Sequence, residues 1–468
     1  MSGNDTIAAV STAPGEGGIG IIRISGEKAA EILGKIFAAS GSERRHDMVF
    51  SDKTMYYGHI IDPASAETVD EALVVFMKGP RSYTGEDVCE IQCHGGGVPL
   101  RRILDIVCGL GAEPAQPGEF TKRAFLNGRI DLAQAGAVID LIRSKTERGY
   151  HAAKEQAEGR LSERVRAARE ILLGVLAEIA ACIDYPEYDG TGKNLDSELV
   201  KTASIVTELL EGAKTGQLVR DGVRAVIVGK PNTGKSSLFN ALVREDAAIV
   251  TATPGTTRDS IEVWLDILGV PVLLSDTAGI RDGAGDVEEL GIKRAKEQYR
   301  KADVSIFLLD GSETLSEEDQ TVAKLLDPEK KHIIVINKTD LPQAFSEQKA
   351  KEILPVAFSE NEILELSLLN DENSKEAVTR IEKALKDFVF GGLSSGSSLF
   401  VTKARHKALL EKAFGEIEEA RSVLSKGEAP EFAEINIRAA WNALGEVTGE
   451  TAAEDIIDRV FEEFCVGK

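Results

Sequence analysis

Strand-like and helix-like runs alternate in the first part of the chain. Three β-rich runs predict strands: Gly20–Ser25, Met55–Asp62 and Ala72–Met77. Two segments with apolar residues at helical spacing predict helices: Glu27–Phe37 and Val98–Leu110. We therefore expect an α+β domain over residues 1–119.

The pattern becomes helical after the breaker-rich segment Glu113–Glu119. Apolar residues then recur at alternating spacings of four and three from Leu161 to Cys182, which places them on one face of a long helix. Such a stripe indicates packing against other helices rather than a cofactor site. We assign residues 120–221 to the first part of a helical domain.

Short β-branched runs, each followed by a loop and a helix, occupy residues 222–390. This alternation is typical of a doubly wound α/β domain. A Gly/Ser-rich linker, Gly391–Ser398, follows, and helical patterns then return. We expect the α/β domain to be inserted into an all-α domain made from two chain segments, residues 120–221 and 391–468.

Charge narrows the class of function. The length of 468 residues is enough for about three domains. The 77 acidic and 55 basic side chains give a net charge of −22, which disfavours binding nucleic acid through bulk charge. The stretch Arg101–Arg169, with thirteen Lys or Arg against nine Asp or Glu, still permits a local RNA contact.

The cysteines and the start of the chain predict a cytoplasmic protein. Five cysteines, an odd number, are scattered over the chain, unlike the dense frameworks of small secreted domains. The N-terminus has no basic region followed by an apolar core. The most apolar helical stretch, Ile171–Ile183, is shorter than the roughly 20 residues that span a bilayer. We expect no signal peptide and no membrane span.

A phosphate-binding loop follows the first strand-like run of the α/β segment. Val223–Val228 leads into Gly229–Ser236 (GKPNTGKS), and the helical run Ser237–Val243 comes next. The glycines let backbone N–H groups curve around phosphates, and the helix presents its positive end. We expect Lys235 to reach the β and γ phosphates and Ser236 to bind Mg²⁺.

Three further motifs predict a Ras-like domain that selects GTP. Asp276–Gly279 (DTAG) follows the predicted strand Val272–Ser275 and places a carboxylate near the metal. Asn337–Asp340 (NKTD) follows the predicted strand His332–Ile336, and its Asp can accept two hydrogen bonds that guanine donates and adenine cannot. The loop Gly255–Asp259 (GTTRD) is of the kind that closes over Mg²⁺ and γ-phosphate.

One position departs from the Ras-like pattern. Ile280 directly follows the DTAG motif, where Ras-like enzymes carry the glutamine that orients the attacking water. Isoleucine cannot orient water, so another carboxylate or amide must do so. The acidic loop Asp282–Glu289 offers candidates, although such a loop is by default solvated surface.

Several segments together resemble the MnmE (TrmE) family of tRNA modification GTPases. They are GKPNTGKSSLFN, TPGTTRD, DTAGI with the downstream VEELGIKRA, NKTD and the terminal FCVGK. GEGGIGIIRISG, SYTGEDVCEIQCHGG and PGEFTKRAFLNGRIDLAQA are similar to the first domain of that family. The resemblance covers essentially the whole chain, although many GTPases share the phosphate-binding loop and NKTD.

The resemblance implies a folate-binding, dimerising N-terminal domain, a helical domain and an inserted G domain. It further implies that the homodimer joins MnmG (GidA), a flavin and NADH enzyme, in a heterotetramer that acts on tRNA. This complex adds a carboxymethylaminomethyl or aminomethyl-type group to the wobble uridine of certain tRNAs. The carbon donor is a tetrahydrofolate derivative, the 5-formyl or 5,10-methylene form. GTP hydrolysis is activated when two G domains meet around K⁺.

The resemblance also assigns residues. Four positions match the potassium site: Asn232, Thr251, Thr253 and Thr256. Ser236 and Thr257 match the Mg²⁺ ligands, and Glu288 matches the catalytic glutamate, which positions the water through a second water. Potassium thus takes the place of an arginine finger, and Glu288 that of the missing glutamine. Four positions match folate contacts: Arg23, Glu90, Arg129 and Lys468, with Arg129 standing where lysine also occurs. For Lys468 to take part, the helical C-terminus must reach the first domain, and we expect it to do so most simply across a dimer.

Two assignments stay open. The segment Leu366–Leu369 (LSLL) departs from the usual Ser-Ala-Lys pattern of base recognition, although its backbone N–H groups can still serve. Cys465 is either a thiolate in the modification chemistry or a packing residue. The expected GTP-binding residues are Gly229, Asn232, Thr233, Gly234, Lys235, Ser236, Ser237, Thr256, Thr257, Asp276, Thr277, Ala278, Gly279, Asn337, Lys338, Asp340 and Ser367.

Two other clusters receive simpler interpretations. Cys89 and Cys93 share one face of a predicted strand about 13 Å apart, too far to bind one ion, so we expect buried cysteines. His94 either lines a pocket or lies in a turn. The basic set in Lys403–Lys407 begins a helix, and we interpret it as a solvated face, with RNA contact as the alternative.

The expected function is therefore that of a potassium-stimulated GTPase in wobble-uridine modification. The alternative is a GTP-dependent binding switch of ribosome assembly, which shares the core motifs. A switch of that kind has no reason to carry a folate pocket or a C-terminal Cys-Val-Gly-Lys.

Overall fold

A computed structural model describes residues 5–40, 48–185, 195–244, 248–249, 262–276, 297–327, 330–353, 363–390 and 400–467. The chain separates into two compact units. Unit 1 contains Met1–Ile139, Ala157–Leu176 and Arg438–Lys468, and unit 2 contains Asp140–Gln156 and Ala177–Ile437. Each unit is described by itself.

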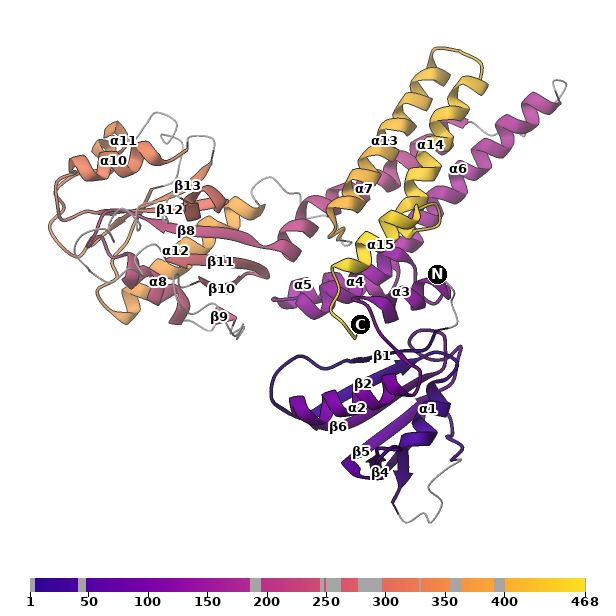
Figure 1. The fold of residues 1–468 in the computed structure, drawn as a ribbon. Helices are drawn as coiled ribbons and strands as arrows, with labels where there is room; N and C mark the ends of the chain where they lie inside the picture. The colour runs from indigo at the N-terminus through magenta and orange to yellow at the C-terminus, as the bar shows by residue number, and fades with distance from the viewer. Residues whose placement is uncertain are drawn as a thin grey trace. The chain divides into compact units, whose positions relative to one another are not determined.

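Unit 1 is built on a seven-stranded sheet (Figure 1). Its strands, in spatial order, are β3 (Phe37–Ala39), β4 (Met55–Ile61), β5 (Thr68–Met77), β6 (Val88–Gly95), β2 (Gly17–Ser25), β1 (Ile7–Val10) and β7 (Glu113–Pro114). Neighbouring strands are antiparallel, except that β1 and β7 run parallel. The three strands predicted from the β-rich runs are confirmed as β2, β4 and β5.

Two helices, α1 (Ala29–Ile36) and α2 (Gly97–Gly109), cover one face of this sheet. Side chains alternate along a strand, so Ile22 and Ile24 of β2 are buried against these helices, whereas Arg23 lies on the opposite face. The alternation therefore gives the sheet an apolar inner face and places a cation on the outer one.

Helices from both ends of the chain pack together beside the sheet of unit 1. The helices that contribute are α3 (Glu119–Leu126), α4 (Leu132–Arg143), α6 (Arg160–Asp184), α14 (Glu431–Thr448) and α15 (Glu454–Glu462). Leu132 and Ile139 of α4 share a core with Phe461 of α15 and with Phe464, which follows it. Segments before and after the α/β region thus form one helical core, as predicted.

The long helix predicted from its apolar stripe is α6. Leu161, Val165, Leu172 and Ile179 are all buried, which confirms the stripe. Cys182, at its end, is only half-buried.

Unit 2 contains the second seven-stranded sheet. Its strands, in spatial order, are β14 (Ile363–Glu365), β13 (Lys331–Asn337), β12 (Val304–Asp310), β8 (Val223–Val228), β11 (Val270–Asp276), β10 (Glu262–Ile267) and β9 (Ala248–Ile249). The first five are parallel, and β10 and β9 add an antiparallel edge.

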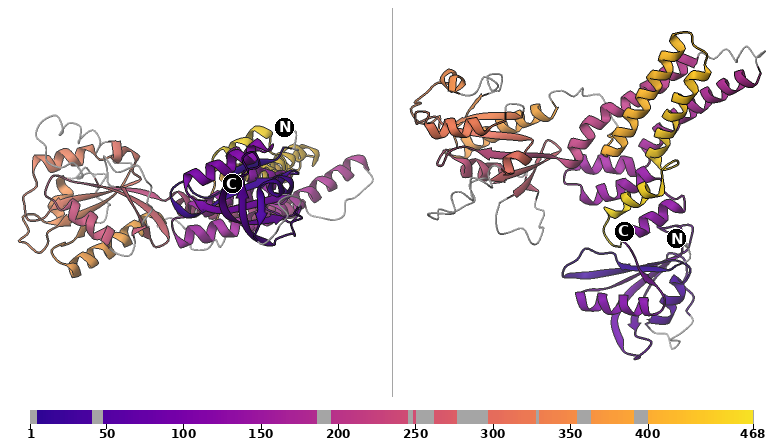
Figure 2. Two further views of the ribbon diagram at one scale, coloured as in Figure 1. Left: turned by 60° about the horizontal axis from the view of Figure 1, so that its bottom comes forward. Right: turned by 45° about the horizontal axis from the view of Figure 1, so that its top comes forward.

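Helices cover both faces of this sheet, as a doubly wound fold requires (Figures 1 and 2). One face packs against α8 (Lys235–Arg244) and α12 (Asp371–Phe390), and the other against α10 (Glu317–Leu325) and α11 (Glu347–Ile353). Ile306 and Leu308 of β12 point to the first pair of helices, and Phe307 and Leu309 point to the second. Both faces of β12 are buried, which explains its continuous apolar sequence.

The helical part of unit 2 includes α5 (Glu147–Ala157), α7 (Leu195–Asp221) and α13 (Ala404–Ser425). The chain enters the α/β region from α7 and leaves it towards α13. Asp140 is bonded to both connections: its Oδ1 accepts from Arg220 Nε at 2.9 Å and from Lys403 Nζ at 3.0 Å. The buried Asp140 therefore joins the entrance and the exit of the α/β region.

The interpretation of the basic set at the start of α13 as a solvated face is wrong. His406 is buried with 1% of its surface exposed, and its Nε2 accepts from Arg405 NH2 at 3.0 Å. Lys403 is bonded to Asp140, so it also lies largely inside unit 2. The alternative, RNA contact by this set, is not favoured by such burial either.

Candidate functional sites

The phosphate-binding loop of unit 2 connects the end of β8 to the first residue of α8, Lys235. Gly234 has a φ of 103°, and a Cβ there would collide with the side-chain amide of Asn337. Only glycine fits this position on both counts. Asn232 also adopts a left-handed conformation, with a φ of 63°, which asparagine tolerates better than most residues.

Lys235 is held over this loop. Its Nζ donates to the carbonyl oxygens of Gly229, at 3.0 Å, and Lys230, at 2.7 Å. The Thr233 hydroxyl donates to the same Lys230 carbonyl at 3.0 Å. The loop thereby presents its ammonium group beside the start of α8, where a phosphate is favoured.

The NKTD motif lies at the end of β13 and is bonded to the loop. Asn337 Nδ2 donates to the Thr233 carbonyl at 2.9 Å. Lys338 Nζ lies 2.5 Å from Asp310 Oδ2. Burial raises the pKa of Asp310, but hydrogen bonds from Lys338 and Ser312 outweigh this effect and hold the pKa below its usual value. Asp310 is therefore an anion that fixes Lys338.

Ser367 supports the residue that would recognise guanine. Its hydroxyl donates to Asp340 Oδ1 at 2.6 Å. The LSLL segment that contains Ser367 follows β14 and is held to β13, because the Leu366 N–H donates to the Ile336 carbonyl at 2.8 Å. Ser367 thus orients the Asp340 carboxylate although its segment departs from the usual pattern.

The remaining predicted nucleotide and metal residues divide into two groups. Ser236 and Ser237 are exposed in the first turn of α8, and Asp276 ends β11, directly beside Ile227 of β8. The others lie outside the described residues: Thr251, Thr253, Thr256, Thr257, Thr277, Ala278, Gly279 and Glu288.

A second candidate site lies in unit 1 on the outer face of the sheet. Arg23 of β2 stands opposite Glu90 of β6 in the strand register. The Nε and NH2 groups of Arg23 donate to Glu90 Oε1 at 3.0 and 2.8 Å. Two of the four residues matched to folate contacts are therefore paired with each other.

The C-terminal tail reaches this site within the same chain. The carbonyl of Gly467 accepts from Ser11 Oγ at 3.0 Å and from Arg23 NH1 at 3.4 Å, and the Gly118 N–H donates to the Cys465 carbonyl at 3.3 Å. We call Cys465–Gly467 with these partners, together with the residues around Arg23, the tail site; the residues around Arg23 are Glu90, Tyr83, Phe120 and Arg129. The expectation that the tail reaches the first domain most simply across a dimer is wrong. The fold of unit 1 already brings the tail there within one chain. Lys468 lies outside the described residues.

Tyr83 is a residue of the tail site that the sequence reasoning missed. The guanidinium carbons of Arg23 and Arg129 lie 5.3 and 5.6 Å from the centre of its ring. Its hydroxyl is hydrogen-bonded to Thr121 Oγ1 at 2.9 Å. The segment SYTGEDVCEIQCHGG carried the signal, since Tyr83 lies in it only seven residues before Glu90.

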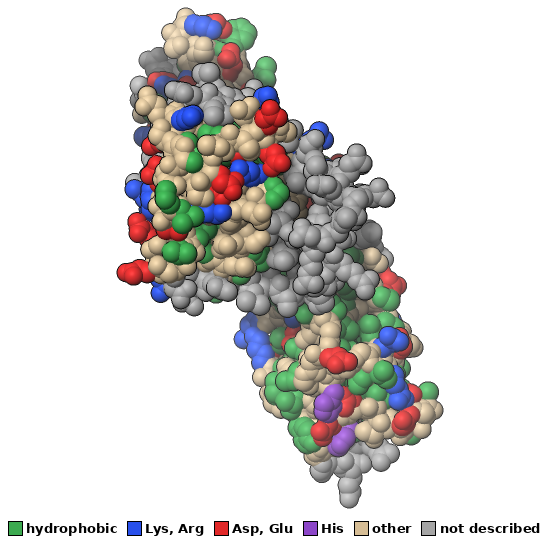
Figure 3. All heavy atoms as spheres, turned by 90° about the vertical axis from the view of Figure 1, so that its left-hand side faces the viewer, with side chains coloured by type: hydrophobic (Ala, Val, Ile, Leu, Met, Phe, Trp, Pro, Cys, Tyr) green, Lys and Arg blue, Asp and Glu red, His purple; other side chains and the backbone are tan. Residues whose placement is uncertain are grey.

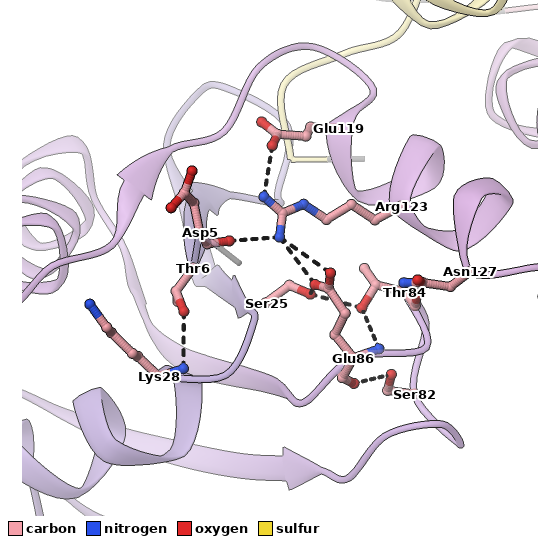
Figure 4. A network of polar contacts seen from close by, with 10 residues as sticks. All are labelled: Asp5, Thr6, Ser25, Lys28, Ser82, Thr84, Glu86, Glu119, Arg123 and Asn127. Carbon is pink, nitrogen blue, oxygen red and sulfur yellow. Dashed lines mark hydrogen bonds and ion pairs between the residues drawn. The ribbon is translucent and has the colours of Figure 1, made fainter. Parts of the chain in front are cut away.

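A partly buried polar network holds the loop that carries Tyr83 (Figure 4). Arg123 of α3 donates to both oxygens of Glu86, at 3.3 and 3.2 Å, and Ser25 donates to Glu86 Oε2 at 2.7 Å. Asn127 Nδ2 donates to the Thr84 carbonyl at 2.8 Å. The loop is thus fastened to β2, to α3 and to Asn127, which follows α3, and these bonds help to hold the Tyr83 ring against the two arginines.

A cavity of about 320 Å³ opens beside Arg129 in unit 1. Asp131, Gln134, Arg166 and Glu450 also line it. Arg166 NH2 is bonded to Asp131 Oδ2 at 2.9 Å, so the charges of this wall are largely balanced.

Comparison with known proteins identifies the family. A family model described as the MnmE helical domain matches residues 132–465, and one described as the N-terminus of the GTP-binding protein TrmE matches residues 6–129. The chain belongs to the MnmE family. The tRNA modification GTPase MnmE of Alkaliphilus oremlandii is 48% identical over 99% of both chains, and that of Geobacillus kaustophilus is 44% identical over 100% of both. Among solved structures, Era of Aquifex aeolicus is 26% identical over 42% of this chain and 66% of that chain, with a TM-score of 0.27.

The cysteines of this MnmE-family chain have different surroundings. Cys89 and Cys93 are buried in β6, as predicted, and burial raises the pKa of Cys93 to about 11. His94 lies in β6 rather than in a turn, and its exposed ring is bonded to Asp70 at 2.7 Å, which raises its pKa. Cys465 is exposed. No cluster of three or more His, Cys, Asp or Glu side chains that could hold a metal ion occurs among the described residues.

At least five of the thirteen basic side chains of the stretch Arg101–Arg169 have acidic partners in unit 1. The pairs in unit 1 include Arg102 with Glu67, Lys122 with Asp458, Arg123 with Glu119 and Arg169 with Glu450. On the face that Figure 3 presents, acidic and basic side chains are interspersed. None of the helices in the described ranges has the length and apolar character of a membrane span.

Proposed function

We propose that this chain is a GTP hydrolase that modifies the wobble uridine of certain tRNAs together with MnmG, with a tetrahydrofolate one-carbon unit as the carbon donor. The observation that carries the proposal is that one chain combines a loop and NKTD motif suited to a guanine nucleotide with a second, separate site around its C-terminal tail. A ribosome-assembly switch, the alternative, has a use for the first site only.

The nucleotide site supports GTP hydrolysis through its own residues. Asp340, oriented by Ser367, would accept the two donors of guanine, and Lys235 would contact the phosphates. Ser236 is exposed at the start of α8, so its hydroxyl is free to join Thr257 in holding Mg²⁺. Bound there, Mg²⁺ would neutralise phosphate charge. We assign the positioning of the attacking water to Glu288, since Ile280 cannot perform it.

The potassium proposal rests on the donor chemistry of Asn232 and the three threonines Thr251, Thr253 and Thr256. Their amide, hydroxyl and carbonyl oxygens suit a large monovalent ion better than a tight octahedral cage. Asn232 is exposed, so its oxygen is accessible. Potassium at this position would supply the positive charge that an arginine finger supplies elsewhere.

We expect GTP hydrolysis to be several-fold faster in KCl than in NaCl at equal ionic strength. The measurement is steady-state phosphate release by the full chain in each salt. Equal rates would overturn the potassium assignment and leave the GTPase assignment intact.

Replacing Glu288 by Ala should lower kcat and leave GTP binding nearly unchanged, whereas wild-type turnover would redirect attention to Asp282, Asp286 and Glu289.

The tail site supports folate binding through its charges and rings. Arg23 and Arg129 bring two positive charges to Tyr83, and Glu90 balances one of them. One net positive charge therefore remains for a carboxylate of the ligand, and the Tyr83 and Phe120 rings offer flat apolar surface. A bound tetrahydrofolate derivative would supply the one-carbon unit. Lys468 is the fourth residue assigned here, and Cys465 keeps both its catalytic and its packing role as alternatives.

The outer face of the N-terminal sheet supports a homodimer. Met55 and Tyr57 of β4 and Leu73 of β5 are exposed there, at 52%, 53% and 38% of their surfaces. The strand register brings Tyr57 beside Leu73. A face with several large apolar side chains is typical of a protein interface, and Arg23 and Glu90 belong to the same face, so dimerisation would enclose the tail site.

Analysis of wobble nucleosides tests the function directly. Cells lacking the protein should lose the modification, and the wild-type chain should restore it. Deleting Cys465–Lys468 should leave GTP hydrolysis largely intact but fail to restore the modification. Normal wobble uridines in cells lacking the protein would overturn the proposal and favour the assembly switch.

A further inference from the structure

Lys230, the second residue of the phosphate-binding loop, has its side chain fixed inside unit 2. Its Nζ lies 3.1 Å from Asp319 Oδ2 and 3.2 Å from Glu313 Oε2. The Lys230 side chain is 10% exposed and that of Asp319 only 4%. Burial lowers the pKa of Lys230, but the two carboxylates outweigh this effect and raise it. Lys230 is therefore a cation, and its contact with Asp319 is largely shielded from water.

The Asp319 carboxylate has few other groups that could balance its charge. It belongs to a capping box at the start of α10, in which its Oδ2 accepts from the Ser316 N–H at 2.9 Å and the Ser316 hydroxyl at 2.8 Å. Its Oδ1 is buried and has no hydrogen-bond partner among the described residues. A buried carboxylate needs a compensating cation, and Lys230 is the cation in contact with it.

The backbone of Lys230 makes a second connection. Its carbonyl oxygen is the one that accepts from Lys235 Nζ at 2.7 Å and from Thr233 Oγ1 at 3.0 Å. The same residue thus holds α10 with its side chain and the phosphate-binding lysine with its backbone. Rotation of the peptide after Lys230 would move the carbonyl away from Lys235.

We propose that Lys230 is a positioning residue for GTP binding and hydrolysis, whose side chain, anchored on Asp319, fixes the carbonyl that orients Lys235. The inference rests on the proposed function of this loop as the GTP site. The contact between Lys230 and Asp319 connects the loop to α10. It adds to the hydrogen bond that Asn337 donates to the Thr233 carbonyl.

Replacing Lys230 with Met tests the proposal, because Met retains the length of the side chain and removes the cation. We expect the dissociation constant for GTP to rise about tenfold and kcat to fall by a similar factor. Replacing Lys230 with Arg keeps the cation and should stay within about threefold of the wild type. The control is the exposed Lys324 of α10, the helix that carries Asp319. Lys324→Met should behave as the wild type.

The affinity measurement separates positioning from simple destabilisation. Partial unfolding lowers the concentration of active protein, so it lowers the apparent kcat but leaves KM unchanged. Fluorescent GTP titration and thermal unfolding of the full chain should therefore be measured together. An unchanged dissociation constant for Lys230→Met, with kcat falling only in proportion to the folded fraction, would overturn the proposal.

A double variant provides a second test of the positioning role of Lys230. Combining Lys230→Met with Asp319→Asn removes both charges, so the penalty of an unpaired buried carboxylate disappears. We expect the double variant to recover thermal stability but to keep its weakened GTP affinity. Recovery of wild-type affinity would show that Lys230 only neutralises Asp319, and would overturn the proposal. Failure of the wild-type chain to hydrolyse GTP would instead overturn the proposed function.

Discussion

In the nucleotide site, Lys235 contacts carbonyl groups that lie only six and five residues before it. In the tail site, Arg23 and the Gly467 carbonyl that it contacts are 444 residues apart. The first site is made by a strand, a loop and a helix that follow one another. The second exists only after the N-terminal sheet and the C-terminal helix α15 have folded into one unit.

This difference has a physical consequence. A local loop is fixed largely by its own backbone conformation and by a few side chains, so one substitution can abolish its chemistry without unfolding the domain. A site made from distant segments depends on the packing of each segment, so changes far from the ligand affect it. We therefore expect the two sites to respond differently to substitution.

The largest effect should come from Lys235→Ala. The ammonium group that would contact the β and γ phosphates is lost, and charge-assisted hydrogen bonds of this kind are among the strongest in proteins. We expect kcat/KM for GTP to fall at least about 1,000-fold, or roughly 4 kcal/mol, with little change in thermal unfolding. Hydrolysis within tenfold of the wild type would contradict a loop that acts through this single side chain. Lys331→Ala, at an exposed strand end, is the control.

Asp140 tests how unit 2 depends on contacts between distant segments. It is bonded to Arg220, 80 residues later, and to Lys403 beyond the α/β region. Asp140→Ala leaves both cations without this largely buried partner, so we expect the free energy of unfolding to fall by about 3 kcal/mol. Chemical denaturation measures this loss.

Asp221 supplies the matched control for that measurement. It also pairs with Arg220, at 3.3 Å, but its side chain is 61% exposed. Water screens such a pair, so Asp221→Ala should change stability by less than about 0.5 kcal/mol. Equal losses in the two variants would show that burial of Asp140 is not what gives its contacts their strength.

Gly467→Ala tests the tail site more gently. Gly467 has a φ of 92°, and a Cβ there would collide with the Val10 carbonyl and lie 2.9 Å from Ser11 Cα. We expect the tail to detach, with faster hydrogen exchange at the C-terminus equivalent to about 1–2 kcal/mol of lost protection. Gly427 has a φ of 73° but open space around its Cβ position, so Gly427→Ala controls for backbone strain alone. Equal exchange at the C-terminus of wild type and Gly467→Ala would contradict a docked tail.

The same contrast explains what could be predicted from the sequence. The strand before the phosphate-binding loop was predicted with its observed bounds, Val223–Val228, because local spacing and turn chemistry determine it. NKTD was likewise predicted at a strand end. Arg23, Glu90 and Arg129 came only from resemblance to a family, since no local pattern states which residues will meet across a sheet.

Contacts between distant segments also explain the errors and omissions. The basic set after the linker has the composition of a solvated helix face. Lys403 is nevertheless held inside unit 2, because it forms an ion pair with Asp140, which lies far earlier in the chain. Tyr83 was missed because its importance comes from two arginines that are distant in sequence. The role of Lys230 could not be predicted from the phosphate-binding motif, because only the fold shows that Asp319 lies beside it.

His406 should give the smallest effect, through pH. Burial lowers its pKa well below the usual value, and the neighbouring cations Arg405, Lys403 and Arg220 act in the same direction. The folded state therefore keeps His406 neutral, whereas the unfolded chain takes up a proton near pH 6.5. Stability from this residue is complete above that pH and is lost as the pH falls, by at most about 1.4 kcal/mol per pH unit. We expect wild-type stability to drop by about 1 kcal/mol between pH 6.5 and 5.5, relative to His406→Gln measured over the same range. His151→Gln, at a residue whose side chain is 67% exposed, should retain the wild-type slope, and equal slopes for His406→Gln and the wild type would refute the assignment of this pH dependence to the buried ring.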